Sequence, residues 1–174
     1  MVSQQNIIDY FNNIATQHRR LNSGASNKKA FFFIPEAYNL TEIDNAIRNL
    51  DIAPFIMLDA MRGTVTDNGG ESHTNDITIQ FSILDEAEVG NAESIRGARD
   101  SAFKIGTDVL TRMKADSRAR NFLAASPNAR MRINNVHYNP IGPMQIKYYG
   151  YVFSLTITCP FSFEVTSATW LDIT

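Results

Sequence analysis

The clearest pattern in the chain is the strict alternation of polar and apolar residues in the stretch NDITIQFSILDE (Asn75–Glu86). Four large apolar residues fall on one side: Ile77, Ile79, Phe81 and Ile83. Alternation with a period of two is typical of a strand that buries one face. The sequence therefore predicts a β-strand over Asp76–Leu84. Its antiparallel partner is expected at Phe55–Val65, because the Gly-rich, polar segment DNGGESHTN (Asp67–Asn75) between them predicts an exposed, mobile loop.

Helical patterns occur in three other segments. After the alternating strand, apolar residues recur every three or four positions: Ile95, Ala98, Ala102, Ile105, Val109 and Met113. This spacing predicts a long amphipathic helix over Ala92–Lys114. The same spacing near the start of the chain predicts a helix over Ser3–Leu21, with Ser3 as its N-cap. A start that resembles a capping box predicts a short helix over Thr41–Leu50.

Further segments predict strands. Ala30–Ile34 is short and apolar and ends at a proline, while Arg130–Pro140 changes parity at Asn134–Asn135, as a bulge or turn would produce. Gln145–Cys159 is predicted to be the longest strand, and Phe161–Ile173 either extends it or returns from it. One face of the longest strand is apolar, and the other holds threonines and mixed residues. The first face consists of Tyr149, Tyr151, Phe153, Leu155, Ile157 and Cys159, and the second includes Ile146, Tyr148 and Val152.

The order of these elements predicts an α+β fold. Strands come in neighbouring antiparallel runs and not in regular alternation with helices. We therefore expect an antiparallel β-sheet with the long amphipathic helix packed across one face and an N-terminal helix. The 174 residues predict a single domain over 1–174, with the N-terminal helix at about 3–21 and the sheet-and-helix core at about 30–174.

Composition narrows the class of protein. Hydrophobic residues make up 44% and charged residues 20%, which are ordinary globular values. The single cysteine, Cys159, excludes an intrachain disulfide and fits a reducing compartment. The N-terminus lacks the pattern of a signal peptide, and no run of 18 apolar residues predicts a membrane span.

The charge distribution is more informative than the net charge of −2, which argues against sequence-specific nucleic-acid binding. Residues 36–93 hold twelve Asp/Glu against two Lys/Arg, whereas residues 96–132 hold nine Lys/Arg against three Asp. One interpretation is that both regions form solvated faces that neutralise each other within the monomer. The other is that an acidic side of one copy meets a basic side of the next.

Candidate catalytic residues are few. The three histidines lack the spacing of metal ligands; His73 lies near Glu71 and Asp76, but an exposed loop histidine is the simpler interpretation. Cys159 is expected to be a buried hydrophobe. Asp59, within an apolar stretch, is either a catalytic acid or, as we favour, a strand-end residue satisfied by a partner.

The three tyrosines near Lys147 either form a stacking platform for nucleic acid or, more simply, cover both sides of a sheet. These tyrosines are Tyr148, Tyr149 and Tyr151. We therefore predict no catalytic site, metal or cofactor, and no enzymatic activity.

The layout resembles tail terminator and tail-completion proteins of long-tailed phages, the small neck proteins that cap the tail tube and join it to the head. The likeness covers most of the chain as a pattern of elements. It is carried by the helix Ser3–Leu21, the segment APFIMLDAMRG (Ala53–Gly63), the strand Asp76–Leu84, the helix Ala92–Lys114 and the strand GYVFSLTITCPFSF (Gly150–Phe163).

This resemblance implies a structural virion protein of the neck, assembled in the host cytoplasm as a homo-oligomeric ring of about six copies. Its partners would be the tail tube protein and neck or connector proteins. An acidic loop would then contact the basic helix of a neighbour, although the basic side could instead face DNA. The expected interface residues are Asp67, Glu71, His73 and Asp76 on the acidic side, and Arg96, Arg99, Arg112, Arg118 and Arg120 on the basic side.

Two alternatives from other classes remain. One is a small-molecule-binding or catalytic α+β domain whose pocket lies between the long helix and the sheet and uses Asp59, a tyrosine or His137. The other is a different phage or secretion-machine component, such as a head-completion or baseplate protein.

Overall fold

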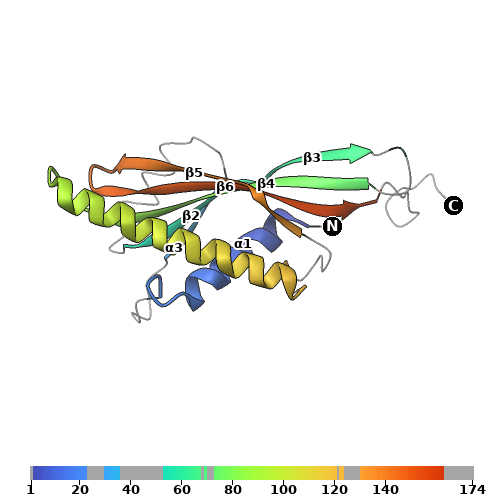
Figure 1. Ribbon diagram of the computed structural model, residues 1–174, viewed down its shortest axis with the longest axis horizontal. Coiled ribbons are helices and arrows are strands. Elements are labelled where there is room, and N and C mark those ends of the chain that lie inside the picture. Colours follow the sequence, from blue (N-terminus) through green and yellow to red (C-terminus); the bar gives the residue numbers. More distant parts are fainter. Residues whose placement is uncertain are drawn as a thin grey trace.

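A computed structural model describes residues 2–22, 30–35, 53–67, 69, 73–120, 122–123 and 130–162, without the side chains of 131–134. The fold is α+β, as predicted: a six-stranded sheet carries a long helix and an N-terminal helix on one face (Figure 1). The helices are α1 (Gln4–Gln17) and α3 (Ala92–Arg118). The strands are β1 (Phe31–Ile34), β2 (Phe55–Asp59), β3 (Arg62–Asp67), β4 (His73–Glu86), β5 (Arg130–Met144) and β6 (Tyr148–Phe161).

The strand order is β1-β2-β4-β6-β5, and β3 pairs with the first part of β4. Every described pairing is antiparallel except that of β1 with β2, which is parallel. The expectation of a purely antiparallel sheet is therefore wrong for this edge. A parallel pair requires a connection of a dozen or more residues, and residues 35–54 connect β1 to β2.

The alternating strand is confirmed and is longer than predicted. β4 pairs with β6 along its whole length and with β2 and then β3 on its other side, so the expected single partner is two strands interrupted at Ala60–Met61. The predicted loop was too wide. Asp67 and His73–Asn75 lie in paired strands. Thr66 and Thr74 are paired directly there, and threonine favours strands, so the hairpin continues further than predicted.

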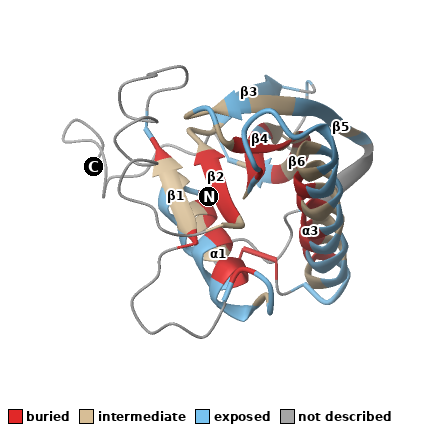
Figure 2. Ribbon diagram, turned by 90° about the vertical axis from the view of Figure 1, so that its left-hand side faces the viewer, coloured by how far each residue is buried: buried red, intermediate tan, exposed pale blue. Residues whose placement is uncertain are grey.

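The predicted apolar faces of β4, α3 and β6 meet in one core. Phe11 of α1 lies 5.1 Å from Phe81, and Phe81 stacks at 5.2 Å on Phe153, measured between ring centroids. The buried side of α3 faces the sheet and its other side is exposed (Figure 2). Gly106, which the apolar pattern did not single out, lies where α3 crosses Phe153 and leaves no room for a side chain.

The opposite face of the sheet is also buried at one end. Leu84, Phe55 and Tyr148 form a second apolar cluster with Ile34 and Met57, which makes the last part of β4 buried on both faces. The first part of β4 is buried only on the side of Ile77 and Ile79. One-sided burial, inferred from the alternation, therefore holds for only half of the strand.

The remaining predictions have mixed outcomes. Ser3 caps α1 by accepting a hydrogen bond from the Asn6 backbone N–H at 3.2 Å, but the helix ends at Gln17, four residues earlier than expected. The parity change in β5 is confirmed as a register shift between Arg132 and His137. Residues 145–147 form a turn and are not part of β6. The predicted helix at 41–50 and the segment 163–173 lie outside the described residues.

Two glycines of α3 provide a matched test of this packing. A methyl group at Gly106 would overlap the buried ring of Phe153, whereas one at Gly97 would meet no atom within 4 Å. We expect Gly106→Ala to lower the free energy of unfolding by about 1–3 kcal/mol through overpacking. Gly97→Ala should instead raise it by up to about 1 kcal/mol through helix propensity. Equal effects in urea denaturation would contradict the placement of α3 against Phe153.

Candidate functional site

A three-stranded arm extends beyond both helices at one end of the long axis (Figure 1). We define the arm as β3 with the first residues of β4 (73–78) and the last residues of β6 (156–161), which are paired in register. At the base of the arm, the start of β5 (130–132) also pairs with residues 156–158. All six residues of β3 are exposed, including Val65 with 42% of its surface accessible. A projecting ladder of this kind offers backbone and side chains to another molecule.

The acidic candidate residues described by the structure lie on the arm. Asp67 and His73 are opposite each other across the hairpin, with Oδ1 and Nδ1 3.2 Å apart. His73 is therefore a half-buried strand residue and not the exposed loop histidine expected. Asp76 accepts a hydrogen bond from the Thr158 hydroxyl at 2.6 Å. Asp76 lies on the opposite face of the sheet from His73, because successive side chains of a strand point to alternate faces. Glu71 lies outside the described residues.

The basic candidate residues do not form one patch. Arg96 and Arg99 lie near the start of α3, whereas Arg118 ends it and Arg120 follows it. At 1.5 Å per residue, Arg99 and Arg118 are roughly 28 Å apart along the helix axis. The guanidinium of Arg99 lies 5.7 Å from the ring centre of Tyr149, where it contributes a cation–π contact within the monomer.

The outer face of α3 also carries acids between its bases. Basic and acidic residues alternate at four-residue spacing: Arg96, Asp100, Lys104, Asp108, Arg112 and Asp116. The Arg112 Nε lies 2.9 Å from Asp116 Oδ2, and His18 Nε2 lies 3.3 Å from Asp108 Oδ2. Alternating charges at this spacing attract one another along a helix. The acids of α3 therefore balance part of the local basic excess within the helix itself.

One polar cluster that the sequence did not reveal joins α1 to α3. The Tyr10 hydroxyl donates a hydrogen bond to Asp116 Oδ2 at 2.8 Å, and Arg112 contacts both oxygens of the same carboxylate. Burial raises the pKa of Tyr10, and the hydrogen bond to Asp116 raises it further. The cluster holds the two helices together. It was invisible in the sequence because its members are about a hundred residues apart.

Asp59 lies on the face of the sheet away from the helices and has a partner. Gln80 Nε2 donates to Asp59 Oδ2 at 2.5 Å, beside a hollow of about 60 Å³ that Arg62 also lines. Burial raises the pKa of Asp59, while the hydrogen bond from Gln80 and the charge of Arg62 oppose that rise. These contacts fit a strand-end acid satisfied by its neighbours.

His137 does not join Asp59 in a site. Register places Asp59, Gln80, Ser154 and His137 in one row across the sheet. Three strand spacings separate the first from the last, or roughly 14 Å. Both candidates lie on the outer face, so the pocket expected between the long helix and the sheet does not contain them.

The other reactive groups are inert or dispersed. Cys159 is buried, as predicted, and burial raises the pKa of its thiol to about 11. Tyr148 faces the second apolar cluster and Tyr151 packs with Phe103, so the tyrosines cover both sides of the sheet as expected. Within the described residues, no group of three His, Cys, Asp or Glu side chains converges as metal ligands would. None of the described helices is long and apolar enough to cross a membrane.

The environment of Asp59 predicts a pH-dependent effect of Asp59→Asn. An acid whose pKa is raised by folding favours the folded state only while protonated, so its ionisation destabilises the protein as pH rises above the ordinary value. Asparagine keeps an oxygen for Gln80 and removes the charge. We expect the variant to unfold at higher urea concentration than wild type at pH 7, with the difference vanishing below about pH 4. A variant that is less stable at pH 7 would contradict this account.

The chain was also compared with known proteins. No model of a known protein family matches it, and no curated protein shows significant similarity. The function of the chain is therefore inferred from its own residues and from the surfaces described above.

Proposed function

We propose that the chain is a structural protein of the phage neck, a tail terminator or tail-completion protein that caps the tail tube as a ring of about six copies and joins tail to head. The observation that carries the proposal is the arm, which projects beyond the helices and exposes every residue of β3. β3, whose residues are all exposed, contributes little to the monomer's core. A contact with another subunit or with the tube gives it a role.

The layout of elements supports the same proposal. An N-terminal helix, a segment entered through Pro54, a strand followed by a long helix, and a late strand are all present in the order of the resemblance. A closed ring of identical subunits requires two different surfaces on each copy. Acidic groups on the arm, Asp67 and Asp76, and basic groups at the C-terminal end of α3, Arg118 and Arg120, give each copy separate surfaces of opposite charge.

Other assignments use the same features differently. If the arginines at the end of α3 line the channel of the ring, they face DNA and not a neighbour. A head-completion or baseplate protein would share the ring and differ in its partner. The ligand-binding alternative has less support, since its candidates Asp59 and His137 are separated on the outer face of the sheet.

Light scattering on a sizing column tests the proposal directly. We expect a species of about six times the 19.5 kDa monomer mass at low salt, which dissociates as salt screens charges between subunits. Electron microscopy of the same fraction should show closed rings with a central opening. A monomer at every salt and protein concentration, with a small molecule bound beside Asp59, would contradict the proposal.

Two arginines provide a matched charge test in the same experiment. Arg120 and Arg19 are both exposed and both follow the end of a helix by two residues. Arg120→Glu should weaken assembly by roughly tenfold, because a like charge would face the acidic neighbour. Arg19→Glu should leave assembly unchanged. Equal effects of the two substitutions would mean that only net charge matters.

A further inference from the structure

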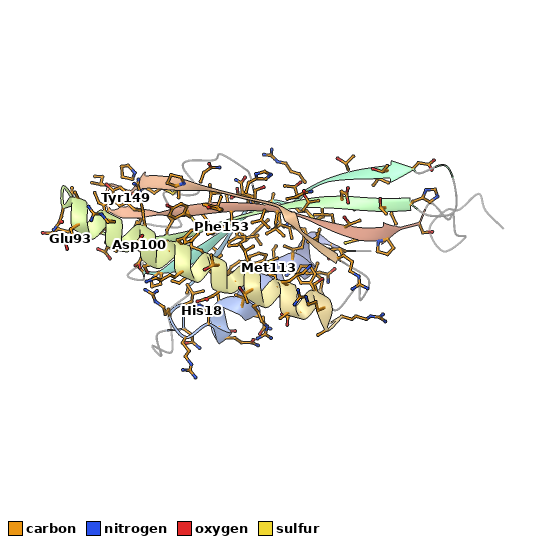
Figure 3. The ribbon with its side chains drawn as sticks, viewed as in Figure 1. His18, Glu93, Asp100, Met113, Tyr149 and Phe153 are labelled. Carbon is orange, nitrogen blue, oxygen red and sulfur yellow. The ribbon has the colours of Figure 1, made fainter. Side chains whose placement is uncertain are left out.

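The end of the molecule opposite the arm forms a small tip. We define the tip as the β4–α3 loop (87–91) and the β5–β6 turn (145–147). The Ala87 backbone N–H donates to the Lys147 carbonyl oxygen at 2.8 Å, and Lys147 Nζ lies 2.9 Å from Glu86 Oε1. These contacts tie the loop and the turn into one unit. Figure 3 places Glu93, in the first turn of α3, at the same end as Tyr149, which follows the turn closely.

The tip displays two aliphatic side chains to solvent. Val89 has 62% of its surface exposed and Ile146 has 71%, so they are the two most exposed large hydrophobic residues described. The sequence pattern predicted Ile146 on one face of a strand over Gln145–Cys159, and that prediction is wrong because Ile146 lies in the turn before β6. Exposed aliphatic residues that gather at one place indicate a contact surface.

The backbone at Ile146 is strained. Its φ is +71° and that of Gln145 is +46°, a left-handed conformation that disfavours β-branched residues. Nearby Gly90, with φ +78°, is the residue type that such a turn ordinarily uses. Glycine or asparagine at position 146 would relieve the strain. An isoleucine held there, and exposed, gains nothing within the monomer, and strain of this kind is characteristic of functional positions.

A hollow of about 400 Å³ lies along one flank of α3. Its described lining is mainly aliphatic carbon with basic groups toward one end: Thr107, Leu110, Thr111, Lys114, Ala115 and Arg118. This is the flank away from α1, because Tyr10 and His18 contact Asp116 and Asp108 on the other side. The hollow exceeds the volume of a single aliphatic side chain.

The two surfaces have complementary charge. Glu88 and Glu93 are exposed at the end of the molecule that carries Val89 and Ile146. Of the bases at this end, Lys147 is held by Glu86, and Arg96 follows Glu93 by three residues along α3. Arg118 lies at the rim of the hollow and has no ion-pair partner among the residues described. Acidic groups around an apolar tip thus match basic groups around an apolar hollow.

We propose that the tip of one copy docks in the α3 hollow of a second copy of this chain. Ile146 and Val89 enter the hollow beside Leu110 and Ala115, and the tip glutamates approach Arg118. The loop before α3 and the centre of the hollow are separated by roughly 30 Å along the helix. The contact is therefore heterologous, and it generates a ring where the rotation closes. The inference rests on the ring proposed above, for which it supplies one joint.

Site-directed cross-linking tests the contact even if it is weak. Ile146→Cys and Ala115→Cys proteins are mixed and treated with a short bis-maleimide, while native Cys159 stays unreactive because it is buried. We expect a cross-linked dimer in the mixture and in neither variant alone. Arg19→Cys, at an exposed position just after α1, replaces Ile146→Cys as the control and should give no product with Ala115→Cys. A dimer formed by Ile146→Cys alone, or equal products with both partners, would overturn the proposal.

A second variant separates docking from folding. Ile146→Asn removes the aliphatic group and suits the left-handed backbone, so its melting temperature should equal or exceed that of wild type while its assembly is lost. Rings that form as in wild type would refute the tip contact and leave the neck proposal standing. Cross-linking without any ring in wild type would support the contact and count against the neck proposal. If neither cross-linked dimers nor rings form, the tip contact and the neck proposal are both refuted.

Discussion

The fold depends on the pairing of β4, which, like its neighbour β6, has a partner along each edge for most of its length. β6 matches it residue by residue from His73↔Phe161 to Glu86↔Tyr148, while β2 and then β3 occupy the other edge. Its alternating sequence fixes which face receives α1 and α3. A shift of one residue in this register would turn Phe81 and its neighbours away from the helices.

Unequal burial along β4 separates a structural half from an exposed half. Toward Glu86 the strand is covered on both faces, by the main core and by the cluster around Phe55 and Tyr148. Toward His73 the polar side chains of the outer face stay accessible, and the sheet continues into the arm. A domain that needed only a stable core could end its strands near Ile77. In the proposed ring, the extra length would contact a neighbouring subunit or the tail tube.

The sequence predicted those elements whose signal lies in the pattern of neighbouring residues. The period-two pattern located β4 and the apolar face of β6, the helical spacing located α3 and α1, and the parity change in β5 located its bulge. Non-local features were missed. The parallel pairing of β1 with β2, the Tyr10–Asp116 contact and the need for glycine at position 106 each depend on residues distant in sequence. Ile146 was misplaced because alternation cannot distinguish the end of a strand from a turn.

The difference between local sequence signals and non-local contacts also affects the interaction surfaces. A count of charges along the chain indicated a basic face on α3, yet the helix places Asp100, Asp108 and Asp116 between the bases and pairs two of them with groups of the monomer. The charges left for a partner include those at the ends of the helix, which lie near exposed aliphatic groups. Electrostatic attraction between such surfaces sets orientation and rate of association more than affinity. The affinity of a subunit contact would then come from the apolar residues that folding leaves exposed.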